Sequence, residues 1–104
     1  AFHNGTDFGA PGGTNVLAAE SGKVLVAEWY GGYGNTVIIN HGNGLWTLYA
    51  HMQNNSITVK EGDIVQKGDV IGKVGTTGRS TGNHLHFEVR LNGQVVDPRE
   101  YLNL

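Results

Sequence analysis

The sequence has 104 residues, of which 17 are Gly and none is Cys, and its formal net charge at pH 7 is −2. This length is that of one domain, and the absence of Cys excludes a disulfide framework and any site built on thiolates. The seven Lys and Arg are scattered, and no apolar run approaches the roughly 20 residues of a membrane helix. We therefore expect no nucleic-acid binding and no membrane segment in this chain.

Short segments of alternating apolar and polar residues, separated by glycine-rich turns, predict strands in most of the chain. The first 15 residues lack this pattern and are interpreted as a Gly-rich loop, and Asp97-Pro98 can begin a short helix through Leu102, with Asp97 as its N-cap. The sequence therefore predicts an all-β fold with a short C-terminal helix. The expected strands are residues 22–30, 35–41, 45–52, 57–59, 70–74 and 83–91.

The strand at residues 83–91 carries the strongest functional signal. Because side chains alternate along a strand, His84, His86, Glu88 and Arg90 share one face, and the apolar residues between them form the core face. The two imidazoles, with Cα atoms about 7 Å apart, can converge on a metal ion or on reacting atoms. A solvated polar face is the alternative interpretation.

The other three histidines differ in their setting. His51, near the end of the strand at 45–52, would face the same site if that strand pairs with 83–91. His41 follows an apolar run and precedes a turn, which favours a structural ring that bonds to loop backbone. In an extended strand the Cα atoms of His3 and Asp7 would lie about 13 Å apart. These two residues can therefore bind the same metal ion only if the chain bends near Gly5. His, Asp and another His form a good zinc set with a fourth position open to water.

These motifs, in this order and spacing, resemble the zinc endopeptidases of the lysostaphin/LytM type, peptidase family M23, over nearly the whole chain. The resemblance implies an antiparallel β-sheet sandwich of short strands and Gly-rich turns, related to hammerhead-barrel folds. The matching pieces are His-x-x-x-Asp at His3 and Asp7, the runs 34–44 and 59–72, Tyr-Ala-His-Met at 49–52, and Thr-Gly-Asn-His-Leu-His-Phe-Glu at 81–88.

The same resemblance implies residue roles. His3, Asp7 and His86 are the expected ligands of one Zn²⁺, and His51 and His84 are the expected catalytic pair. One imidazole would take a proton from water and the other would stabilise the oxyanion, with the assignment left open between the two.

Three further residues are expected near the site. Glu88 is expected to orient a zinc ligand or to pair with a Lys or Arg, and Asn35 and Tyr49 are expected to contact substrate or to support a ligand.

The implied function is that of a zinc metalloendopeptidase, a hydrolase that cleaves peptide cross-links or stems of bacterial peptidoglycan. The expected location is extracellular: secreted, in the cell envelope of a bacterium, or in a phage-borne lytic protein. We expect residues 1–104 to be one peptidase domain that lacks its N-terminal strand or loop, within a larger protein that carries other domains.

Two other functions compete with this one. A LytM-like domain that is not catalytic can serve as a regulatory or binding module of the cell-wall machinery. The turn motif at 59–72 also resembles biotinyl and lipoyl carrier domains, but no lysine of this sequence lies at a matching hairpin tip.

Overall fold

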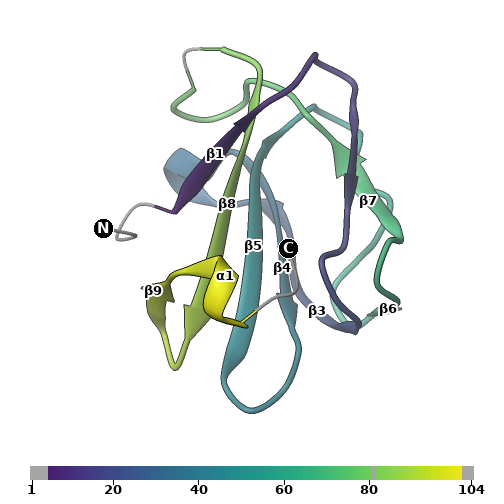
Figure 1. Cartoon of the computed structure of the whole chain (residues 1–104). Coiled ribbons are helices and arrows are strands. Elements are labelled where there is room, and N and C mark those ends of the chain that lie inside the picture. The colour runs from purple at the N-terminus through teal and green to yellow at the C-terminus, as the bar shows by residue number, and fades with distance from the viewer. Residues whose placement is uncertain (1–4, 81, 102–104) are drawn as a thin grey trace.

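The structure is a computed structural model that describes residues 5–80 and 82–101. Two antiparallel sheets lie against each other (Figure 1). The larger sheet has the strand order β1-β8-β5-β4-β3-β6, and β9 also pairs with β8. Its strands are β1 (Thr6–Gly9), β3 (Gly22–Trp29), β4 (Asn35–Asn40), β5 (Leu45–Met52), β6 (Ile64–Val65), β8 (His84–Leu91) and β9 (Gln94–Val96). The smaller sheet pairs β2 (Asn15–Leu17) with β7 (Val70–Lys73).

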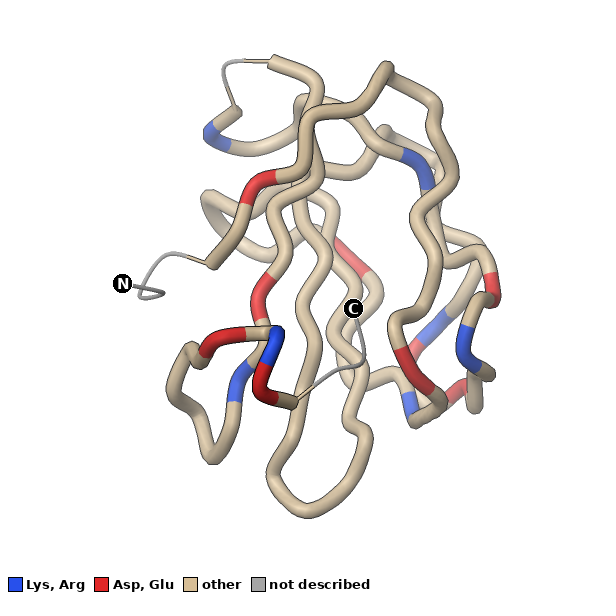
Figure 2. Tube along the Cα trace, viewed as in Figure 1, with Lys and Arg blue, Asp and Glu red and all other residues tan. Residues whose placement is uncertain are grey.

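The predicted all-β architecture is confirmed, and so is the short C-terminal helix, α1 (Pro98–Tyr101). Asp97 caps this helix, since its Oδ1 accepts the amide of Arg99 at 2.9 Å. No helix in the described part of the chain is long and apolar enough to cross a membrane. Lys and Arg are scattered along the described chain rather than gathered on one face (Figure 2).

The expectation that the first 15 residues hold no strand is wrong. β1 pairs with β8, with Asp7 opposite His86, and β2 begins at Asn15. β1 lacks the alternation of apolar and polar residues that predicts a strand. Its strand conformation comes from pairing with β8. The expected strand at 57–59 is also wrong, although Ile57 and Val59 still pack against the core.

The main core fills the space between the two sheets. Tyr49, Met52 and Phe87 of the larger sheet meet Val16 and Ile71 of the smaller one, and each is at most 5% exposed. A smaller cluster of Ile38, Leu48 and Ala50 lies on the other face of the larger sheet. β5 is therefore buried on both faces, and it pairs with β8 beside it.

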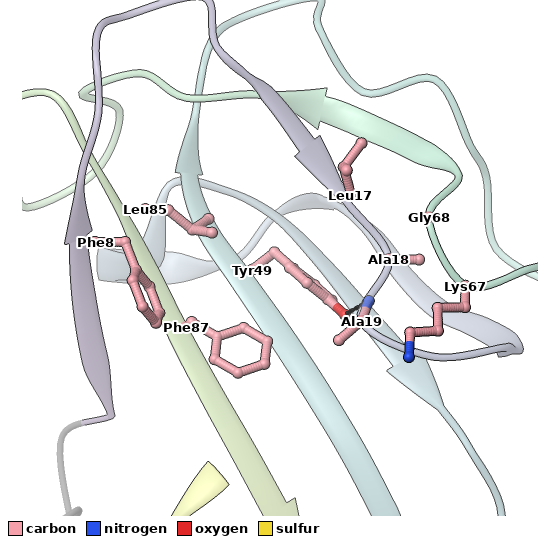
Figure 3. Close-up of a pocket in the computed structure, with 9 residues that line it drawn as sticks. All are labelled: Phe8, Leu17, Ala18, Ala19, Tyr49, Lys67, Gly68, Leu85 and Phe87. Carbon is pink, nitrogen blue, oxygen red and sulfur yellow. Dashed lines mark hydrogen bonds between the residues drawn. The ribbon is translucent and has the colours of Figure 1, made fainter. Parts of the chain in front are cut away.

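A chain of hydrogen bonds links His41 to the core. Its Nδ1 lies 2.7 Å from the Ser21 carbonyl, its Nε2 lies 2.7 Å from Thr47 Oγ1, and Thr47 Oγ1 lies 2.8 Å from the Tyr49 hydroxyl. The Ala19 amide completes the chain by donating to that hydroxyl at 2.9 Å (Figure 3). The prediction that His41 is structural and bonds to loop backbone is confirmed.

A Tyr49→Phe variant should lose stability and should also respond less to alkali. Burial raises the pKa of Tyr49 above its ordinary value of 10.0, so its stabilising contribution is complete below about pH 10 and falls as pH rises towards the folded-state pKa. The variant also leaves the partly buried Ala19 amide without its acceptor, at a cost of about 1 kcal/mol. Urea unfolding at pH 7 to 11 measures both effects. A variant curve that falls as steeply above pH 10 as the wild type would contradict this account.

Candidate functional site

The larger sheet presents a polar group on the face away from the main core. His84, His86, Glu88 and Arg90 of β8 lie on this face, while Phe87 and Val89 point into the core. The alternation predicted for β8 is therefore correct.

The pairing of β1 with β8 brings Asp7 to the two histidines of β8. Asp7 Oδ1 lies 2.7 Å from His86 Nδ1 and 3.7 Å from His84 Nε2. The Asp7 side chain is 62% exposed, so this carboxylate lies where the site opens to solvent.

Gly5 allows the chain to approach β8 just before Asp7. Its φ is +77°, and a Cβ at this position would lie 2.6 Å from the Phe87 carbonyl oxygen and from Glu88 Cγ. Any side chain would therefore be both strained and obstructed. The bend expected near Gly5, between His3 and Asp7, stays a prediction. His3, the first expected ligand, lies outside the described residues.

Glu88 is a buried carboxylate that accepts hydrogen bonds at both of its oxygens. Oε2 accepts from the Tyr33 hydroxyl at 2.7 Å and from His86 Nε2 at 2.8 Å, and Oε1 accepts from Arg90 Nε at 2.7 Å. Burial raises the pKa of Glu88, but the bonds from His86, Tyr33 and Arg90 outweigh it and lower that pKa to about 2. The expectation that Glu88 pairs with a Lys or Arg agrees with this geometry.

Glu88 in turn orients the His86 ring. The hydrogen bond to Glu88 raises the pKa of His86 above 6.5, against the opposing effect of burial, and the bond to Asp7 adds to the rise. With Nε2 held by Glu88, Nδ1 is the nitrogen that faces Asp7. A ligand histidine in a metal site commonly has this arrangement, with its far nitrogen donating to a carboxylate.

His51 reaches the same face through a break in the alternation of β5. The register between β4 and β5 shifts here, and His51 has φ +62°. Unbroken alternation would place His51 on the face of Tyr49, in the main core. The bulge instead sends Met52 into the core and leaves the His51 ring 5.1 Å from that of His84. Bulges near functional sites often redirect a side chain in this way.

Thr77 and Asn35 hold the bulge in place. The Met52 carbonyl accepts from Thr77 Oγ1 at 2.6 Å and from Asn35 Nδ2 at 3.1 Å. His51 Nδ1 lies 2.7 Å from the Thr77 carbonyl and must donate to it. Burial lowers the pKa of His51 below 6.5, and the bond to Thr77 opposes this only in part. The neutral ring therefore presents an unprotonated Nε2.

His84 is also fixed by backbone. Its Nδ1 lies 3.0 Å from the Gly82 carbonyl and donates to it, and Ser80 Oγ lies 3.4 Å from the same nitrogen. Nε2 is thus the nitrogen that faces Asp7. Asp7, His51, His84 and His86 together make one cluster with two orienting backbone carbonyls.

The structure does not bring Tyr49 to this cluster, which corrects the expectation that it contacts substrate or supports a ligand. Its ring is 1% exposed and packs on Phe87, on the opposite face of the sheet. It lines an apolar pocket of about 330 Å³ there, with Phe8, Leu17, Ala18, Ala19, Lys67, Gly68, Leu85 and Phe87 (Figure 3). The Asn35 side chain donates to the Met52 carbonyl at 3.1 Å and to Asn54 Oδ1 at 2.8 Å, so it supports the backbone next to His51.

Sequence reasoning missed Thr77 and Tyr33. Thr77 lies in a polar loop whose residues give no sign of which one bonds to β5. Tyr33 lies in the short 3₁₀ helix Gly31–Tyr33, and its ring centroid lies 5.6 Å from that of His86. Within residues 5–80 and 82–101, no group of three or more His, Cys, Asp or Glu side chains is arranged to hold a metal ion.

Comparison with known proteins finds similar sequences among bacterial cell-wall enzymes and their activators. The "DD-carboxypeptidase/endopeptidase Mpg" of Neisseria meningitidis is 52% identical over 97 residues, which are 93% of this chain and 22% of that protein. The "Murein hydrolase activator EnvC" of Escherichia coli is 40% identical over 98 residues, 94% of this chain and 23% of that protein. The chain thus spans about a fifth of the length of these curated relatives.

Solved structures agree with these relatives. The catalytic domain of the antimicrobial peptidase lysostaphin from Staphylococcus simulans superposes with a TM-score of 0.87 at 37% identity, covering 98% of this chain and 80% of that one. A zinc-containing peptidase from Vibrio cholerae superposes with a TM-score of 0.84 at 43% identity, covering 91% of this chain and 29% of that one. The family model "Peptidase family M23" matches residues 1–98. The chain belongs to peptidase family M23.

Proposed function

We propose that this protein is a zinc-dependent endopeptidase that cleaves peptide cross-links or stems of bacterial peptidoglycan at the cell envelope or outside the cell. The observation that carries the proposal is the convergence of Asp7, His51, His84 and His86, which come from three different strands, on one small volume. A fold needs no such cluster for its stability, and three of these side chains have one nitrogen fixed by a named acceptor.

Asp7 and His86, together with His3, would hold the zinc ion. Carboxylate oxygen and imidazole nitrogen are the donors that zinc takes in catalytic sites with an open position. The Oδ1 of Asp7 and the Nδ1 of His86 already meet at 2.7 Å, and the buried Glu88 keeps the other nitrogen of His86 occupied. When bound, a zinc ion supplies Lewis acidity towards a peptide carbonyl and water of lowered pKa.

His51 and His84 supply the proton chemistry. His51 is neutral with Nε2 unprotonated, so it can take the proton of the attacking water as a general base. His84 holds its Nδ1 proton on the Gly82 carbonyl and directs Nε2 towards the site. From this nitrogen His84 would donate a hydrogen bond to the scissile carbonyl oxygen as negative charge develops on it. Both rings are positioned before substrate arrives, which lowers the cost of reorganisation.

A regulatory role is the second candidate, because the similar EnvC is named as an activator. A binding module has no need of an imidazole whose Nδ1 is anchored by a strained bulge, and His51 has that arrangement. The intact cluster therefore favours catalysis over regulation.

Digestion of purified peptidoglycan, with mass spectrometry of the released peptides, tests the proposal. The zinc-loaded protein should release peptides cut at a defined bond. A chelator should stop the release, and one equivalent of Zn²⁺ should restore it. A folded protein that binds peptidoglycan and releases nothing with zinc present would favour the regulatory module instead.

A Glu88→Gln variant should bind zinc about 10–100-fold more weakly, because it removes the charge that fixes and polarises His86. Competition with a chromophoric zinc chelator measures the affinity. Glu28→Gln removes a carboxylate that is exposed and should leave the affinity unchanged. Equal affinities of the wild type and Glu88→Gln would show that Glu88 does not support the metal site.

A further inference from the structure

Two loops beside the cluster are locked together. The segment 30–34, which includes the short 3₁₀ helix Gly31–Tyr33, packs on the segment 77–79. The Arg79 amide donates to the Gly32 carbonyl at 2.8 Å, and the Asn35 amide donates to Thr77 Oγ1 at 3.1 Å. Because Thr77 also anchors His51, the position of these loops is tied to the position of the proposed general base.

Arg79 differs in its surroundings from the other two arginines of the sequence. Its side chain runs along Gly32, where an added Cβ would lie 3.3 Å from Arg79 Cδ. Arg90 pairs with Glu88 and Arg99 pairs with Asp97, whereas the exposed Arg79 guanidinium has no carboxylate partner within residues 5–80 and 82–101. The sequence from 70 to 87 contains no Asp or Glu, and the loop shows no acidic segment in Figure 2.

A surface pocket of about 310 Å³ lies next to Arg79. Tyr30, Gly31, Gly32 and Tyr33 line it. The Tyr33 ring stacks on Tyr30 at 5.9 Å and packs against His86 at 5.6 Å. One aromatic ring therefore separates this pocket from the cluster, so a peptide held at the cluster can extend across it.

We propose that Arg79 binds a carboxylate of the peptide substrate in this pocket, and that the enzyme therefore prefers anionic peptides. The inference rests on the proposed function and names the substrate chemistry of that same site. A guanidinium pairs with a carboxylate through two parallel hydrogen bonds, which gives both charge and direction. Contact with Gly32, which lines the pocket, keeps the Arg79 stem beside it, and the guanidinium has no protein carboxylate partner in the described chain, so its donors remain for a ligand. The carboxylate can come from the substrate's C-terminus or from an acidic side chain.

The test compares kcat/KM for four synthetic cross-linked peptides and four forms of the zinc-loaded protein. The first peptide has a free C-terminal carboxylate and an acidic side chain. In the second the C-terminus is an amide, in the third the acidic side chain is an amide, and in the fourth both groups are amides. The proteins are the wild type, Arg79→Met, Arg79→Lys and the control Lys73→Met, which removes an exposed positive charge from β7.

Arg79→Met should lower kcat/KM about tenfold on the peptide that keeps the recognised carboxylate, as expected for the loss of a charge-assisted hydrogen bond, and Arg79→Lys should lower it less. The fully amidated peptide should show no difference between wild type and Arg79→Met, and Lys73→Met should match the wild type throughout. The peptide whose single amidation removes the effect identifies the source of the carboxylate.

The outcomes separate this inference from the proposed function. If Arg79→Met lowered kcat/KM equally on the charged and the fully amidated peptides, or on neither, the role of Arg79 would be overturned. Cleavage by the wild type in the same assay would still support the proposed peptidase. A wild type that cleaves none of the four peptides would overturn the proposed function and this inference with it.

Discussion

A His86→Ala variant should lose both its zinc and its ability to cleave peptidoglycan. The change removes the nitrogen that meets Asp7 at 2.7 Å and leaves Asp7 and His3 as the only remaining members of the proposed ligand set. Two ligands hold zinc far less firmly than the three that catalytic sites use. We expect less than a tenth of an equivalent of bound zinc after gel filtration and no measurable release of peptides.

The control for this variant is His41→Ala. It also removes an imidazole, but one that lies on the core face and bonds to Ser21 and Thr47. His41→Ala should be less stable and should still carry one equivalent of zinc. Circular dichroism distinguishes loss of a site from loss of the fold. If a folded His86→Ala retained full zinc, His86 would not be a ligand and the proposed metal site would be wrong.

His84→Ala should keep the zinc and lose most of its turnover. His84 would act on the reacting carbonyl through Nε2 without holding the metal, so the affinity for zinc should change little. Removal of a group that transfers or donates a proton in the transition state commonly costs about 10²–10⁴-fold in kcat. Metal analysis and initial rates on a cross-linked peptide, taken from the same preparation, measure the two quantities together.

Thr77→Val is the informative companion to His84→Ala. It removes the hydroxyl that donates to the Met52 carbonyl but keeps both imidazole side chains, His51 and His84, in the protein. If the position of His51 matters as well as its chemistry, Thr77→Val should retain zinc and should lose less turnover than His84→Ala. Full activity of His84→Ala would exclude His84 from the catalytic pair.

Much of the site follows from the sequence, because alternation along β8 is unbroken. The same rule that sends Phe87 and Val89 into the core places His84 and His86 together on the other face. The partnership of Glu88 with Arg90 was also accessible, since residues two apart on a strand are neighbours on one face. Local pattern is sufficient for these features.

His51 shows where local pattern fails. Alternation along β5 assigns it to the face of Tyr49, yet the bulge and its positive φ turn it to the other side. Nothing in the sequence of β5 indicates a bulge. It depends on hydrogen bonds to the Met52 carbonyl from Asn35 and Thr77, which are 17 and 25 residues away.

The strands β1 and β2 were missed for a related reason. β1, with the sequence Thr-Asp-Phe-Gly, shows no alternation, and β2 is only three residues long, too short for alternation to mark it. β1 forms because β8 offers an edge with free backbone donors and acceptors, and this pairing is what delivers Asp7 to His86. Tyr49 was misassigned because its motif lies next to His51 in sequence, whereas its ring lies on the opposite face of the sheet.

The most direct test of the central claim is a crystal structure of the zinc-loaded protein with anomalous diffraction measured at the zinc edge. The account predicts one strong peak in contact with Asp7 and with Nδ1 of His86, with His3 as the third protein ligand and His51 and His84 facing the open side. A peak elsewhere, or no peak beside Asp7 and His86 in a protein that still cleaves peptidoglycan, would contradict it.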